Sequence, residues 1–151
     1  MKSEKAKHFG IKRALQSATL GLLIAFLFMT LLAGGNFLWF ANVNYKLNII
    51  FGIGILYALS YRFGKSAGYE ILIEGKGYNE VGIKYALLTL TLTSFLGWWS
   101  GFLQEGMKPY YMFWTPIEDY IIKPFFWIMV VGIIPTILIG IQCGRWIGKS
   151  K

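Results

Sequence analysis

Few side chains in this 151-residue chain are of the types that catalysis needs. It contains one histidine, His8, and one cysteine, Cys143. A nucleophile, its base and an orienting group must meet within hydrogen-bond reach, and His8 lies in a basic segment remote from the serines of the apolar stretches. A single cysteine allows neither an intrachain disulfide nor a Cys-x-x-Cys redox pair. Clustered Cys and His ligands for a metal are also missing. The sequence therefore predicts no catalytic residues, no metal site and no cofactor.

Two weaker signals for chemistry were weighed against this prediction. The segment Gly64-Lys65-Ser66 ends like a phosphate-binding loop, but the glycine that such a loop needs five residues earlier is Leu59. We interpret that match as coincidence. A lipid-modifying enzyme stays open as an alternative, and it would use a carboxylate or an amine at the membrane edge, such as Glu105 or Lys84.

The distribution of charge indicates that lipid is the solvent of this chain. It is 56% hydrophobic and only 15% charged, whereas a soluble domain carries about a quarter charged residues. So small a globule cannot bury that much apolar surface in its own interior. Four stretches contain no charged side chain: Ala14 to Tyr45, Leu47 to Tyr61, Tyr85 to Gln104 and Pro124 to Gly144. They predict an integral membrane protein in contact with membrane lipids.

The basic residues are placed unevenly between these stretches. The formal net charge is +8, and twelve of the fifteen basic residues precede the first stretch, separate the second from the third, or follow the fourth. Positive charge is retained on the cytoplasmic side of a membrane. We therefore expect both termini and the middle connection to lie in the cytoplasm. The membrane is expected to be a bacterial plasma membrane. This placement also argues against nucleic-acid binding.

A helix that crosses the hydrocarbon core needs about 20 residues, and the chain offers four such segments. We predict an all-α, four-helix membrane bundle with both termini inside. The expected spans are approximately 15–35, 46–62, 83–104 and 122–144, with a basic cytoplasmic tail over 1–14, a membrane domain over 15–151, a cytoplasmic connection over 63–82 and an outer connection over 105–121. The second span is the shortest, and a re-entrant segment over 47–61 is its alternative. The first is interpreted as a signal anchor that is retained, rather than a cleaved signal.

Local signals place the helix ends. Gly34, Gly35 and Asn36 mark the outer end of the first helix, and Gly75-Lys76-Gly77 marks the end of a second helix that continues past Arg62. A short hairpin that pairs 71–73 with 81–83 is the alternative there. Thr115-Pro116-Ile117-Glu118 is a capping box that predicts the start of the fourth helix at Pro116. Pro124 and Pro135 then fall inside it as candidate kinks.

Small residues at four-residue spacing predict where the helices pack, because close backbone approach holds helices together in lipid. Two series of four are unbroken, and we expect them to face each other. They are Thr89, Thr93, Gly97 and Gly101 in the third span, and Gly132, Thr136, Gly140 and Gly144 in the fourth. A seam between two copies of the chain is the alternative use of these residues.

The predicted spans contain no ionisable group at membrane depth, whereas ion-coupled transporters usually keep one there. By elimination, the sequence predicts a small multi-pass membrane protein that acts as a non-catalytic accessory, regulatory or immunity-type subunit. Its expected partner is another membrane protein or further copies of itself. A subunit of an oligomeric permease for a small solute is the alternative. The charged segment 62–84 and the aromatic outer connection are the two candidate surfaces for a partner.

Overall fold

The computed structural model describes residues 3–38, 46–105 and 117–150. These residues form four long helices, which are α1 (Ser3–Leu32), α2 (Lys46–Leu72), α3 (Tyr78–Glu105) and α5 (Lys123–Gly148), together with a π-helical turn, η2 (Glu118–Ile122). The described ranges contain no strand. The prediction of an all-α protein is confirmed.

Three of these helices, α1, α3 and α5, are long and apolar enough to cross a membrane. α2 is not among them, and its segment was also the shortest of the four uncharged stretches. It nevertheless has 27 residues, which corresponds to about 40 Å of helix.

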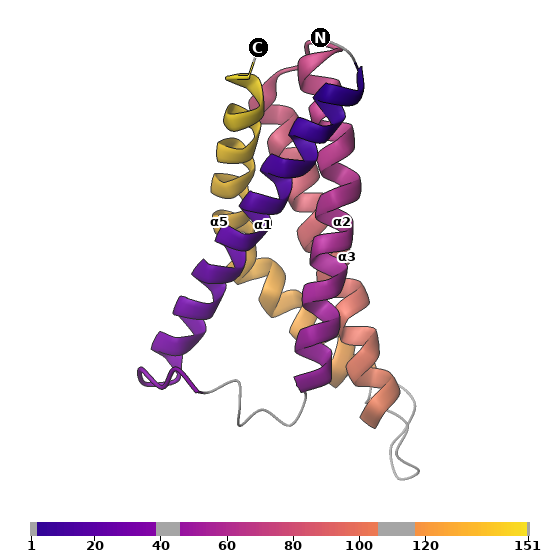
Figure 1. Cartoon of the computed structure of the whole chain (residues 1–151). Helices are drawn as coiled ribbons and strands as arrows, with labels where there is room; N and C mark the ends of the chain where they lie inside the picture. The colour runs from indigo at the N-terminus through magenta and orange to yellow at the C-terminus, as the bar shows by residue number, and fades with distance from the viewer. Residues whose placement is uncertain (1–2, 39–45, 106–116, 151) are drawn as a thin grey trace.

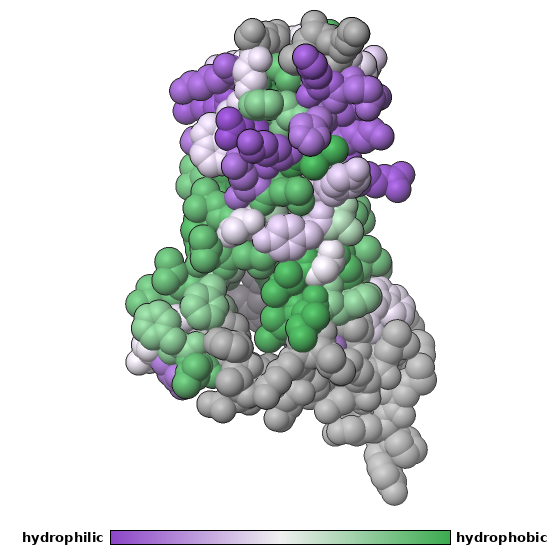
Figure 2. Space-filling view, viewed as in Figure 1, coloured by the Kyte–Doolittle hydropathy of each residue, from purple (hydrophilic) through white to green (hydrophobic). Residues whose placement is uncertain are grey.

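The four long helices form one antiparallel bundle (Figure 1). α1 packs on α2, α3 packs on α5, and α2 contacts α3 between the two pairs. The start of α1, the α2–α3 connection and the end of α5 all lie at the same end of the bundle. Figure 2 shows hydrophilic side chains gathered at this end and a hydrophobic belt below it. We call it the charged end, and we call the opposite one the far end.

Glycines with positive φ end α1 and α2. At the end of α1, the N–H of Gly35 donates to the carbonyl of Thr30 at 2.9 Å, with Gly34 and Gly35 at φ +67° and +83°. At the end of α2, the N–H of Lys76 donates to the carbonyl of Glu70 at 3.0 Å across Gly75, whose φ is +72°. Such positive φ values carry little cost in glycine, which has no Cβ. The predicted continuation of the second helix is confirmed, and the alternative hairpin is excluded.

Other boundaries depart from the sequence prediction. The basic segment assigned to a tail is part of α1, which starts at Ser3. Both prolines lie in helical backbone: Pro124 follows η2, which continues into α5 because Ile122 and Lys123 keep helical φ and ψ, and Pro135 lies inside α5. α5 bends in its middle part (Figure 1), as expected of a residue that removes a backbone hydrogen bond. Thr115 and Pro116 of the predicted capping box lie outside the described residues.

The tightest helix contacts lie near the charged end. In the first pair, a Cβ added to Gly10 would stand 2.2 Å from the carbonyl oxygen of Gly64, and one added to Gly68 would stand 2.3 Å from that of Ala6. Real Cβ atoms do not approach so closely, so only glycine permits this crossing. α1 and α2 are therefore locked together at backbone distance.

The second pair is built in the same way. A Cβ on Gly82 would stand 2.2 Å from the carbonyl oxygen of Gly140, and one on Gly144 would stand 2.0 Å from that of Tyr78. Around these crossings lies the core of the described residues, formed by Ala6, Ala67, Ile71, Leu72, Val81 and Ile147. The packed interior thus lies at the charged end, whereas the far end exposes many of its apolar side chains.

Candidate functional site

A carboxylate at the charged end is the centre of the largest polar network among the described residues. Glu70 lies in the last turns of α2, and its side chain is only 13% exposed. The phenolic oxygen of Tyr85, on α3, donates to Glu70 Oε1 at 2.5 Å, and Lys84 Nζ donates to the same oxygen at 3.2 Å. Glu70 therefore joins α2 to the first turns of α3.

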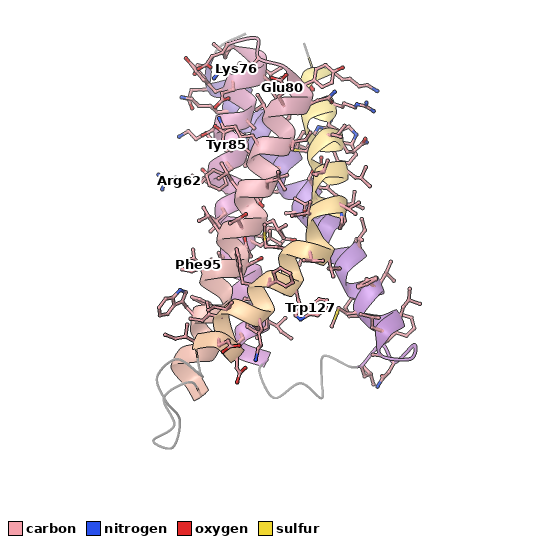
Figure 3. All side chains as sticks on the ribbon, turned by 180° about the vertical axis from the view of Figure 1, so that it is seen from behind. Arg62, Lys76, Glu80, Tyr85, Phe95 and Trp127 are labelled. Carbon is pink, nitrogen blue, oxygen red and sulfur yellow. The ribbon has the colours of Figure 1, made fainter. Side chains whose placement is uncertain are left out.

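A second lysine reaches Glu70 from the α2–α3 connection. Lys76 Nζ lies 3.3 Å from Glu70 Oε2 and 2.8 Å from Glu74 Oε2. Both lysine side chains are about half exposed, at 51% for Lys76 and 52% for Lys84. The network is therefore a shielded anion covered by two cations that remain open to a partner. Figure 3 shows Lys76 and Glu80 at the charged end, with Tyr85 further down the bundle.

The hydrogen bonds fix the protonation of the cluster. The hydrogen bond from Tyr85, followed by those from the two lysines, holds the pKa of Glu70 below its ordinary value, although burial acts in the opposite direction. The hydrogen bonds with Glu74 and Glu70 raise the pKa of Lys76. The hydrogen bond with Glu70 likewise raises the pKa of Lys84, so Glu70, Lys76 and Lys84 are all charged at neutral pH.

The aromatic ring of Tyr85 supports the network from the apolar side. Its centroid lies 5.6 Å from that of Phe63, on α2, and Lys84 Nζ lies 4.7 Å from the Tyr85 centroid. An open depression of about 530 Å³ adjoins the cluster on the outside, lined by Glu70, Lys76, Gly77, Glu80, Val81 and Lys84. Asn79, close by, has a buried Oδ1 without a hydrogen-bond partner.

This arrangement suits recognition better than proton transfer. Glu70 is saturated with donors and held in its ionised form, whereas a general base works best with a pKa near the operating pH. The exposed faces of Lys76 and Lys84 present positive charge at fixed positions. They could pair with carboxylates or phosphates of a molecule that approaches the charged end. Lys84, a candidate amine for the lipid-modifying alternative, donates to Glu70. The side chain of Glu105 lies outside the described residues.

The predicted packing series are divided between different neighbours. In the fourth-span series, Gly140 and Gly144 lie against α3, and a Cβ on Gly132 would stand 3.3 Å from the side chain of Leu90. Thr136, the remaining member, is half-buried on α5.

At Gly97 the third-span series faces α2 rather than the fourth-span series. The Cβ position of Gly97 points to Gly52 of α2, at 3.8 Å from its Cα. Thr93 is half-buried with an unpartnered hydroxyl, and Thr89 donates to the carbonyl of Tyr85 at 2.7 Å. The surroundings of Gly101 lie outside the described residues.

The residues that do make the closest contacts were missed: Gly10, Gly64, Gly68 and Gly82. They were overlooked because they lie in the basic segments assigned to the tail and to the cytoplasmic connection. The available signal was the four-residue spacing of small residues, which are Ala6, Gly10 and Ala14 on α1, Ser60, Gly64 and Gly68 on α2, and Gly82 and Ala86 on α3. Glu70 was noted only as a member of a charged segment, and nothing in its neighbours along the chain identified it as the hub.

The fold and the network together define an all-helical protein with three helices able to cross a membrane and a charge cluster at one end. Comparison with models of protein families, with curated proteins and with solved structures finds no match to the chain.

Proposed function

We propose that this chain is a four-span plasma-membrane protein with its charged end in the cytoplasm, and that it acts as a non-catalytic accessory, regulatory or immunity-type subunit. Its cytoplasmic end would bind an acidic region of a membrane-protein partner. The clustering of basic residues supports the orientation, because positively charged segments stay on the cytoplasmic side.

The direction of the helices supports four spans. α1 and α3 run in the same direction, from the charged end to the far end (Figure 1). If both cross the bilayer, the chain must return between them, and α2 is the element that does so. Its about 40 Å of helix exceed the about 30 Å of a hydrocarbon core. Arg62, which is exposed on α2 below the level of Tyr85 (Figure 3), can extend its long side chain towards the headgroups.

The Glu70 network carries the functional proposal. It is the most developed polar arrangement in the described part of the chain, and it lies at an end of the bundle rather than within the hydrophobic belt. A partner protein can meet it there, whereas a solute that crosses the bilayer would need polar groups at membrane depth. The half-exposed amines of Lys76 and Lys84 favour an acidic partner surface.

A site-directed crosslinking experiment tests the proposal. A photoreactive residue is placed at Lys76, and in a matched control at Leu31, which is 75% exposed near the far end. We expect irradiation of cells to give one discrete adduct from position 76, abolished by a Lys84→Glu change. Position 31 should not give that adduct. Absence of a protein adduct at position 76, or an adduct that survives charge reversal, would contradict the proposal.

Transport of an uncharged solute by an oligomer is the second candidate. The observation that favours it is the divergence of α1 from α2 and α5 towards the far end (Figure 1), which separates helices that a sealed bundle would keep together. Purified protein in liposomes distinguishes the two functions. Solute flux through the protein alone would support transport and contradict the accessory function.

A further inference from the structure

The two helix pairs make the same contacts at equivalent positions. A Cβ added to Gly10 would stand 2.2 Å from the carbonyl oxygen of Gly64. A Cβ added to Gly82 would stand 2.2 Å from the carbonyl oxygen of Gly140. A Cβ on Gly64 would meet the Gly10 oxygen at 2.9 Å and Ile11 Cα at 3.1 Å. A Cβ on Gly140 would meet the Gly82 oxygen and Ile83 Cα at the same two distances. α1 therefore corresponds to α3, and α2 corresponds to α5.

The sequence carries the same correspondence. Gly10-Ile11-Lys12-Arg13-Ala14-Leu15 on α1 matches Gly82-Ile83-Lys84-Tyr85-Ala86-Leu87 on α3 at every position but one. On the return helices, Ile71 and Ile147 are equivalent, and they are the largest completely buried side chains of the described residues. The chain thus consists of two equivalent helical hairpins.

The contacts between the hairpins are also related. Tyr85 of α3 reaches Glu70 of α2. The equivalent residues are Arg13 of α1 and Trp146 of α5, and the Arg13 guanidinium lies 5.9 Å from the Trp146 ring centroid. The α3–α2 contact is a hydrogen bond from a phenol to a carboxylate, and the equivalent α1–α5 contact is a guanidinium near an indole ring. The hairpins are consequently related by an approximate two-fold rotation at the charged end.

The rotation fails towards the far end. There α3 stays beside α2, with the Gly97 Cβ position 3.8 Å from Gly52 Cα. The equivalent residues are Ala25 of α1 and Ile128 of α5, but Ala25 is exposed and α1 diverges from α5 (Figure 1). Leu27 and Leu31 are 55% and 75% exposed. Only the last third of α1 departs from the symmetric arrangement.

The point of departure is a glycine. Gly21 is the last glycine of α1, and its Cβ position stands 3.4 Å from the Ile139 side chain of α5. The equivalent residue of α3 is Thr93. Glycine inside a helix costs roughly 1 kcal/mol relative to alanine and makes the helix easier to deform. α1 therefore has a candidate hinge that α3 lacks, while the Gly10 crossing fixes α1 at the charged end.

We propose that the last third of α1 moves about Gly21 between the observed open position and a closed one that reproduces, against α5, the packing of α3 against α2. In the closed position Ala25 meets Ile128. This contact would be equivalent to the one between Gly97 and Gly52, which the structure shows. This movement opens and closes the side of the bundle between α1 and α5.

Cysteine crosslinking in the full chain tests the closed position. In a Cys143→Ala background, which removes the only cysteine, the pair Ala25→Cys/Ile128→Cys is oxidised in membranes. Gly97→Cys/Gly52→Cys is the reference pair, and Ile24→Cys/Ile128→Cys is the control, turned by about 100° on α1. We expect the Ala25 pair to crosslink at least fivefold more than the Ile24 pair, and Gly21→Ala to reduce this crosslinking severalfold. Equal crosslinking by the Ala25 and Ile24 pairs, beside a reactive reference pair, would overturn the proposal.

A second measurement covers the case in which cysteines at these positions disturb the fold. Spin labels at Leu27 and Trp127, both of which are exposed, report the distance between α1 and α5 without altering a packed contact. Two distance populations, with the shorter one diminished by Gly21→Ala, are expected. A single population unchanged by Gly21→Ala would contradict the movement.

Discussion

The substitution Gly82→Ala tests the backbone-distance crossing of α3 and α5. The added methyl carbon would stand 2.2 Å from the carbonyl oxygen of Gly140. Ordinary van der Waals contact begins near 3.4 Å, so the helices must separate by roughly 1 Å or shift along each other. Overpacking of this kind costs about 1–3 kcal/mol, and here both contacting groups are backbone and cannot rotate away. The loss should therefore lie at the upper end of that range.

The matched control is Gly54→Ala, because a Cβ at Gly54 has nothing within 4 Å. Both substitutions gain the helix propensity of alanine, worth up to about 1 kcal/mol, so the difference between them isolates the steric cost. A difference of about 3 kcal/mol corresponds to roughly 6–12 °C in the midpoint of thermal unfolding for a chain of this size. The assay is thermal unfolding of the purified protein in detergent. Equal midpoints for Gly82→Ala and Gly54→Ala would refute the close crossing.

Three further predictions concern the network, the packing series and the bend of α5. Glu70→Gln should lower the free energy of unfolding at neutral pH by about 1–2 kcal/mol. Because the pKa of Glu70 is lowered in the folded protein, its stabilising effect is present above the unfolded pKa of about 4.3 and is lost as pH falls through the folded pKa. The free energies of unfolding of the two proteins, measured by denaturation from pH 7 to pH 3, should therefore converge. A constant difference across this pH range would contradict the assignment. Gly140→Leu should destabilise the protein more than Gly97→Leu in the same unfolding assay, since a Cβ at Gly140 would stand 2.9 Å from the Gly82 carbonyl oxygen and one at Gly97 would stand 3.8 Å from Gly52 Cα. The reverse order would contradict these contacts. Pro135→Ala should slow amide hydrogen exchange in the middle of α5 by restoring a backbone hydrogen bond. Unchanged exchange would show that the proline does not cause the bend.

Much of the fold follows from the sequence, because helix formation and helix termination are local. The uncharged stretches identify the helical segments, and Gly34-Gly35 and Gly75 supply the positive φ that ends α1 and α2. The prolines of α5 were less informative. Pro124 and Pro135 have the same local chemistry, yet a π-helical turn directly precedes Pro124, whereas the bend lies in the middle part of α5, the helix that contains Pro135 (Figure 1).

The helix faces could be predicted only in part. Four-residue spacing identifies one face of one helix, but the depth at which two helices cross depends on both partners. Gly140 and Gly144 pack closely against α3, as expected of a packing face. The series expected to face them on α3 lies further from the charged end than this contact. The contact is made by Gly82 instead. Comparing the two halves of the chain would have revealed Gly82, because Gly10 and Gly82 start the same five-residue match.

The Glu70 hub could not be predicted from the sequence. Its partners Tyr85 and Lys84 lie on another helix, and the register between α2 and α3 is set by the length of the glycine connection. That register places the Tyr85 hydroxyl within hydrogen-bond distance of Glu70. Charge counting finds a mixed segment there, but it does not distinguish Glu70 from Glu74 or Glu80.

Labelling of single cysteines shows whether the chain crosses the bilayer four times with its charged end in the cytoplasm. The cysteines are placed at Asn36, Gly75 and Ser150 in the Cys143→Ala background, and intact cells are treated with a membrane-impermeant maleimide. We expect labelling at Asn36 alone, with Gly75 and Ser150 labelled only after the membrane is permeabilised. Labelling of Gly75 or Ser150 in intact cells would contradict it.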